Sequence, residues 1–190
     1  MGTATLRPSS DPATTSETVM GILSRLTGLF SPAEHAAREA DREFGTGVWR
    51  QHHDRFMRAV DRFYETAVAL DRETGDSTEA AQAAGEQIAA LTAPLNEAAG
   101  QVTELTRRLH SRWPVEGLVV PAGVRSACGP LPEKLSQAAT KAAEAGQAAA
   151  MARIAVRARR DPAAPTAAAT RFVGDVTALI DECTRLDAAS

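Results

Sequence analysis

The chain has 190 residues but few aromatic side chains, few lysines and only two cysteines. Aromatic residues make up 4% of it, so small side chains must fill much of the core that its 44% hydrophobic fraction can form. Cys128 and Cys183 lack a CxxC spacing, which favours reduced thiols over a disulfide framework or a zinc site. Lys134 and Lys141 are the only lysines, and this arginine-rich, alanine-rich composition is typical of a bacterial source with GC-rich coding.

Charge and hydropathy argue against several classes of partner. The formal net charge is −3 and the isoelectric point is about 5.8, so no overall field attracts nucleic acid or an anionic bilayer. No apolar run approaches the roughly 18 residues that span a membrane. Residues 1–16 have neither the basic start nor the apolar core of a secretory signal. We therefore expect a cytoplasmic protein that does not bind nucleic acid.

The amino-terminal residues divide into two segments. Residues 1–16 are rich in Thr, Ser and Pro and show no periodicity, which predicts a disordered tail. Residues 17–30 place apolar side chains on one helical stripe, which predicts a short amphipathic helix. A contact surface for a partner is expected on this stripe, which consists of Val19, Ile22, Leu23, Leu26, Leu29 and Phe30. Residues 31–190 are predicted to form the bundle domain.

Helical periodicity dominates the rest of the chain. Ser31 and Pro32 are typical of a helix start, and Gly45-Thr46-Gly47 predicts an interruption. Four further segments then place apolar residues at alternating steps of three and four, a coiled-coil-like spacing. They run from Trp49 to Leu70, from Ile88 to Leu109, from Leu135 to Val156, and from Ala169 to Leu186. The pattern predicts an all-α protein, an antiparallel (up-down-up-down) four-helix bundle with an extra short N-terminal amphipathic helix.

The boundaries and kinks of these helices also have sequence signals. Gly75 is expected to end the first long helix in the left-handed conformation, and Asp76 to cap the next. Pro94 should kink the second helix one turn upstream, without ending it. Asp161 and Pro162 are expected to begin the fourth helix.

The third segment carries alanine at nearly every core position, so its neighbours can approach closely. Phe56, Phe63 and Tyr64 of the first long helix are expected to fill the space beside it. The fourth segment is expected to bury Phe172, Leu179 and Leu186 along with Ala169, Val176 and Cys183. Residues 112–131 form a long connection rich in Pro and Gly, which is either a functional loop or a lid over one end of the bundle.

No catalytic, metal or cofactor site is predicted. Di-iron bundles need a Glu-x-x-His pair on two helices, and no histidine here follows a Glu at that spacing. The most notable polar cluster is His52-His53-Asp54, because phosphorelay domains present an acceptor histidine on a helical bundle. His53 falls on the core seam and is expected to be a partly buried packing residue, with His52 exposed.

Two groups of arginines lie in the last turns of predicted helices. Arg107, Arg108 and Arg112 form the first group, and the second consists of Arg153, Arg157, Arg159 and Arg160. Cations at these positions offset the helix macrodipole, and acidic residues of the first long helix should lie near the second group. We therefore expect local neutralisation in preference to an anion-binding site.

These observations favour a non-enzymatic interaction protein, a scaffold or adaptor that binds a protein partner or associates with itself. The expected contact surfaces are the stripe of residues 17–30 and the loop around Trp113; a membrane surface is disfavoured because Arg25 is the only basic residue in residues 17–30. A bundle that binds a ligand or a phosphoryl group through His52 or His53 is an alternative.

A second alternative is a helical protein exported by a type VII system. Trp113 and Gly117 lie between two predicted helices, where small type VII substrates carry a Trp-x-Gly turn, but the spacing here is longer. Val68 stands where the Tyr-x-x-x-Asp/Glu export signal after Tyr64 would require an acidic residue. Export is therefore the less favoured of the two alternatives.

Overall fold

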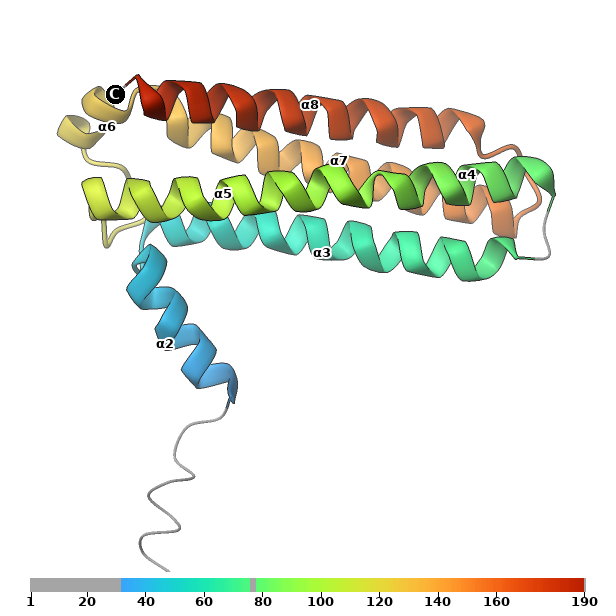
Figure 1. The fold of residues 1–190 in the computed structure, drawn as a ribbon, viewed down its shortest axis with the longest axis horizontal. Coiled ribbons are helices and arrows are strands. Elements are labelled where there is room, and N and C mark those ends of the chain that lie inside the picture. Colours follow the sequence, from blue (N-terminus) through green and yellow to red (C-terminus); the bar gives the residue numbers. More distant parts are fainter. Residues whose placement is uncertain (1–31, 76–77, 190) are drawn as a thin grey trace, which may run out of the picture. The chain divides into compact units, whose positions relative to one another are not determined.

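The computed structural model describes residues 32–75 and 78–189, and every regular element in them is helical (Figure 1). The helices are α2 (Pro32–Phe44), α3 (Val48–Thr74), α4 (Glu79–Ala90), α5 (Thr92–Arg112), α6 (Ala122–Cys128), α7 (Leu131–Arg157) and α8 (Ala163–Ala188). The all-α prediction is therefore confirmed. The predicted tail of residues 1–16 and the predicted helix of residues 17–30 lie outside the described residues.

The chain divides into two compact units, residues 1–39 and residues 40–190. Of the first unit, the structure describes only the beginning of α2, where the side chains from Glu34 to Glu39 are exposed. The packing described below belongs to the second unit. As predicted, a helix opens at Pro32 and is interrupted at Gly45-Thr46-Gly47 before α3 begins.

Two predicted helix ends differ from the structure. Gly75 follows α3 with φ −50° and ψ −44°, a right-handed conformation, so the left-handed cap expected there is wrong. The cap of α4 is Thr78, whose hydroxyl accepts a hydrogen bond from the Ala81 amide at 3.4 Å. Asp76, which was expected to cap this helix, lies outside the described residues. A Thr cap serves the same purpose, because it satisfies one of the free amides of the first turn.

Pro94 has no amide hydrogen to donate, so a kink is predicted one turn upstream in the second long segment, and the structure has a break there. The break falls at Leu91, one turn before the proline, and α4 and α5 continue in line on either side of it (Figure 1). The Leu91 amide donates to the Ile88 carbonyl at 3.2 Å, and the Thr92 hydroxyl donates to the Ala89 carbonyl at 2.7 Å. These local bonds stabilise the break. The structure therefore has two helices placed end to end, and the prediction of one kinked helix is wrong.

The long helices pack in an order that differs from their order in the sequence. α3 packs against α7 on one side and against α4 and α5 on the other. α8 also packs against α7 and against α4 and α5, on the side of them away from α3. The Arg153–Glu73 ion pair joins the ends of α7 and α3, and Arg108–Asp187 joins the ends of α5 and α8, so these neighbours run parallel. α5 and α7 are thus separated by α3 and α8. The connection between α5 and α7 is long because it has to cross the end of the packed helices.

The alanine seam of α7 lies in the core as predicted. Five of its members are fully buried, namely Ala138, Ala142, Ala145, Ala149 and Ala152. A Cβ atom placed on Gly146 would lie 3.9 Å from the Cα atom of Phe63, so the backbones of α7 and α3 approach closely. Phe56 and Phe63 are both buried beside this seam. Tyr64 is 55% exposed, and its predicted place in the core is wrong.

The register of α8 is only half as predicted. Ala169, Val176 and Cys183 are buried, but the intervening core positions are Val173, Ile180 and Asp187. Phe172, Leu179 and Leu186, which the pattern placed in the core, are partly buried at its edge. The buried carboxylate of Asp187 is held by Arg108 at 2.8 Å and by Arg112 at 3.4 Å. An apolar pattern cannot indicate a core position that an acidic residue occupies.

Replacement of Ala145 by Leu should destabilise the protein by about 1–3 kcal/mol, because a fully buried alanine between close helices leaves no room for added volume. Ala143 is exposed on the same helix, so Ala143→Leu is the matched control. Urea denaturation of the three proteins measures the difference. Equal free energies of unfolding for Ala145→Leu and the parent would contradict the close packing of α7.

Candidate functional site: a cleft beside the long connection

The connection between α5 and α7 is tied to the start of α3 by two long-range hydrogen bonds. The Val48 amide donates to the Gly117 carbonyl at 3.0 Å. The indole Nε1 of Trp49, which is fully buried, donates to the Trp113 carbonyl at 2.8 Å. The side chains of Val115 and Val120 are buried as well. These contacts fix the backbone of residues 113–120 against the core.

Two glycines allow this close approach. Gly45 has φ +70°, and a Cβ atom there would overlap the imidazole of His110. A Cβ atom on Gly47 would overlap the backbone carbonyls of Val115 and Gly117. The two glycines were recognised in the sequence only as a helix interruption. In the structure, they are also the positions where a side chain would push other groups away.

A cleft of about 290 Å³ lies between the start of α3, the tip of the connection and the start of α7. His52 contributes to one wall, and Arg125 and Glu133 contribute to another. Leu118 and Val119 form the rim and are 65% and 76% exposed, respectively. They are the two most exposed large apolar side chains that the structure describes, and the backbone on both sides of them is fixed.

His52 is half-buried in this cleft, so the prediction that it is exposed is wrong. Burial lowers the pKa of His52, the positive charge of Arg55 lowers it further, and Glu133 opposes the shift. Arg55 is itself held in place, because its guanidinium donates to the hydroxyls of Ser136 and Thr140 at 3.0 Å each. At neutral pH, His52 is therefore an uncharged side chain on a mainly apolar wall.

His53 lies on a different side of α3 and is engaged by protein groups. Its ring stacks on Phe44 with centroids 4.1 Å apart, Nδ1 lies 3.0 Å from an oxygen of Asp54, and Nε2 lies 3.4 Å from the Thr103 hydroxyl. Burial alone would raise the pKa of Asp54, but hydrogen bonds from His53 and Arg50 lower it below its ordinary value. His53 and Asp54 thus contact each other, whereas His52 lies apart from them in the cleft, so the three residues do not form one site.

Trp113, which the sequence suggested as a contact residue, is half-buried and supports the connection. Its carbonyl binds Trp49, and the guanidinium of Arg112 lies 5.2 Å from its ring centroid. The exposed apolar residues of the connection are instead Leu118 and Val119. The apolar stretch from Val115 to Val120 was the available signal, but the sequence could not show that its two ends are buried and the residues between them exposed. The predicted contact stripe of residues 17–30 lies outside the described residues.

The connection also contains helix α6, which sequence patterns missed. Its seven residues are too few to show a periodic signal, and Pro121 and Gly129 at its ends resemble loop punctuation. Cys128 closes this helix and is buried, as is Cys183 in α8. Burial raises the pKa of both thiols, that of Cys183 to about 11, so neither is a ready nucleophile.

The first arginine group is neutralised as predicted. Arg107 forms ion pairs with Glu43 and Glu104, while Arg108 and Arg112 both bind Asp187.

Within residues 32–75 and 78–189, there is no group of three or more His, Cys, Asp or Glu side chains that could hold a metal ion. No helix in the same ranges is both long enough and apolar enough to cross a bilayer. The cleft combines apolar residues of the connection with His52, Arg125 and Glu133.

Comparison of the chain with protein-family models gives no match, and the comparisons with curated proteins and with solved structures give none either.

The lowered pKa of His52 predicts a loss of stability in acid. The stability it contributes is fully present above the unfolded-state pKa of about 6.5 and is lost as the pH falls through the lower folded-state value. Urea midpoints at about pH 7.5 and about pH 5 should therefore differ less for His52→Gln than for the parent. His35 is exposed, and His35→Gln serves as the control. An identical pH dependence in all three proteins would contradict the burial of His52.

Proposed function

We propose that this chain is a non-enzymatic interaction protein, a cytoplasmic four-helix bundle that acts as a scaffold or adaptor. In this proposal, the cleft beside the long connection binds an apolar side chain of a protein partner. The observation that carries it is the exposure of Leu118 and Val119 on a backbone that the core holds in place. Exposed apolar groups on such a support are typical of contact surfaces.

The fixed backbone supports this proposal because binding to an ordered surface costs little conformational entropy. The tip of the connection lies between buried Val115 and Val120, and the Gly117 carbonyl is bonded to α3. Leu118 and Val119 therefore need no ordering before they contact a partner. Arg125 and Glu133, an ion pair 3.2 Å long at the edge of the same cleft, offer polar contacts around the apolar centre.

The interior also favours a scaffold over a ligand-binding bundle. A ligand site between the helices would be expected near Trp49, His53 and Tyr64. Trp49 is fully buried, the ring nitrogens of His53 face Asp54 and Thr103, and Tyr64 is on the surface. The fully buried alanines of α7 occupy the space between α3 and α8. These features leave the ends and outer surface of the bundle as places for a partner.

The double variant Leu118→Asp, Val119→Asp should lose partner binding without losing stability, because both side chains are exposed in the free protein. A photo-crosslinking residue at position 119 identifies the partner in cells, and titration with the purified partner then measures the affinity. We expect at least a tenfold loss of affinity, about 1.4 kcal/mol, with little change in melting temperature.

Met151→Asp is the matched control, because Met151 is 55% exposed on α7 and away from the cleft. If the double variant and Met151→Asp bound the crosslinked partner as well as the parent does, the cleft would not be the contact surface.

Deletion of residues 1–30 tests the predicted contact stripe of residues 17–30. If this segment is a docking element, the truncated protein should keep its melting temperature and lose affinity for the partner. A lower melting temperature with intact binding would instead mean that the segment stabilises the bundle. Thermal denaturation and titration of the truncated protein against the full chain measure both quantities.

A further inference from the structure

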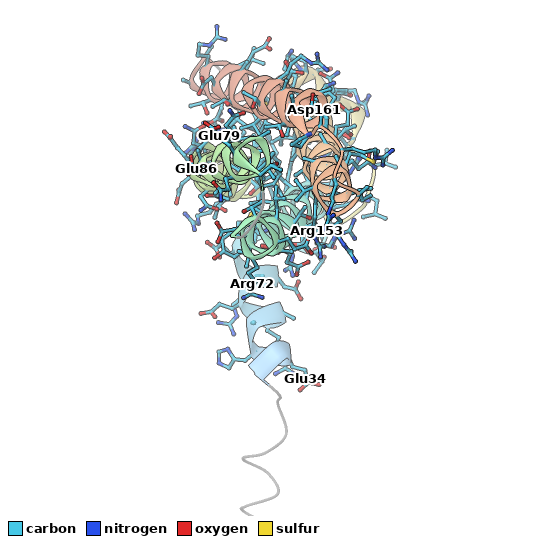
Figure 2. The ribbon with its side chains drawn as sticks, turned by 90° about the vertical axis from the view of Figure 1, so that its right-hand side faces the viewer. Glu34, Arg72, Glu79, Glu86, Arg153 and Asp161 are labelled. Atoms are coloured by element: carbon cyan, nitrogen blue, oxygen red, sulfur yellow. The ribbon has the colours of Figure 1, made fainter. Side chains whose placement is uncertain are left out.

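A larger cavity lies at the opposite end of the molecule, where α3 gives way to α4 and α7 to α8. Its volume is about 850 Å³, within the range of sites that bind small molecules. Arg157, Arg159 and Arg160 line it together with the first turn of α4 and the start of α8. Figure 2 looks at this end along the helices, with Asp161 at the turn into α8 and Arg153 below it on α7.

The three arginines that line this cavity differ from their neighbour Arg153. The guanidinium of Arg153 donates to one oxygen of Glu73 at 2.6 Å and 3.0 Å, so that charge is neutralised. Arg157 adds only a longer-range field at Glu73. None of Arg157, Arg159 and Arg160 forms an ion pair with a carboxylate of the part of the chain that the structure describes. Among the described residues, the neutralisation expected for this group is therefore shown for Arg153 alone, and Asp76, one of the acidic residues expected near the group, lies outside them.

The acidic residues that line this cavity, Glu73 and Asp161, each have a partner within the protein. One oxygen of Asp161 accepts a hydrogen bond from the Ala163 amide at 2.9 Å and caps the start of α8. Glu73 is bound by Arg153. The last turns of α3 and α7 and the first turns of α4 and α8 meet at this cavity, so their opposite helix-end partial charges offset one another and the arginine side chains supply the positive charge. Among the lining residues that the structure describes, three arginines stand against two carboxylates, and Glu73 is already paired with Arg153, so the balance of side-chain charge is positive.

The backbone of the α7–α8 turn holds two of the arginines in place. The Arg159 amide donates to the Val156 carbonyl at 2.9 Å, and the Arg160 amide donates to the Ala155 carbonyl at 2.8 Å. Arg159 has φ +52°, a left-handed conformation in which glycine is the usual residue at the end of a helix. The turn thus carries a guanidinium where backbone geometry alone would favour glycine.

We propose that this cavity binds a small organic molecule that carries two or more phosphate groups. The guanidinium groups of Arg157, Arg159 and Arg160 contact the phosphate oxygens, which match the planar fork of arginine. The less polar part of the molecule lies against Val156, Ala81 and Pro162, which line the same cavity. This site is at the end of the molecule opposite the Leu118–Val119 cleft and does not depend on the function proposed for that cleft.

Isothermal titration calorimetry of the full chain at low ionic strength tests the site, with ATP and inorganic tripolyphosphate as the two probes. Both should bind, and ATP should bind at least fivefold more tightly because only ATP has a less polar part. The variant Arg157→Ala, Arg159→Gly, Arg160→Ala should weaken both by at least tenfold. Glycine at position 159 keeps the left-handed turn, and circular dichroism verifies that the variant is folded.

Arg185→Ala is the matched control, since it removes an exposed arginine near the far end of α8. It should leave both affinities within twofold of the parent. The proposal is overturned if the parent binds neither probe. It is also overturned if the triple variant, which removes three charges, loses affinity only by the cube of the factor lost by Arg185→Ala, which removes one, because binding would then follow net charge and not the cavity. Equal affinity for ATP and tripolyphosphate would overturn the contact with the apolar wall.

Discussion

The close approach of α7 to its two neighbours is the constraint on which the rest of the structure depends. Alanine at the buried positions of α7 and glycine at position 146 allow its backbone to lie near Phe63 of α3. Because α7 contributes little side-chain volume, the larger side chains of α3 fill the remaining space. Since the helices lie close together, this space is small, and a few aromatic residues are enough to fill it.

The position of α7 between α3 and α8 has a consequence for the connectivity. α5 cannot lie beside α7, so residues 113–130 must pass across the end of the helices. A chain segment in that place covers the start of α3 and brings a second layer of apolar side chains, Val115 and Val120, into the core. The position of α7 between α3 and α8 therefore accounts for the length of this connection, for its buried valines and for its exposed tip.

The elements with long periodic patterns could be predicted from the sequence, and those with competing patterns could not. The seams of α3, α5 and α7 repeat apolar residues over many turns with little ambiguity. In α8, two neighbouring stripes are apolar, and the stripe that includes Phe172 and Leu179 has the larger side chains. The structure buries the other stripe, because Val173 and Ile180 face the core and Asp187 continues it with two arginine partners. The burial of Asp187 under exposed arginines of α5 depends on tertiary contacts that no local pattern encodes.

The candidate sites were predictable only in part for a similar reason. The sequence indicated the long connection and the two arginine groups, but it could not tell which members were paired. Arg153 and Arg157 are one helical turn apart, and only the place of Glu73 on the neighbouring helix separates a neutralised arginine from one that faces a cavity. The exposure of Leu118 and Val119 beside buried valines likewise depends on where Gly47 lies, about 70 residues earlier in the chain.

The hydrogen bond between Val48 and Gly117 also couples the start of α3 to the tip of the connection. No side chain caps the start of α3, and the first-turn amide of Val48 is satisfied by a carbonyl of the connection. A remote segment thus serves as the helix cap, so any displacement of residues 115–117 leaves a helix-end amide without its acceptor. The tip of the connection and the junction between α2 and α3 are linked in this way, because a displacement of either one acts on the other through the Val48–Gly117 hydrogen bond.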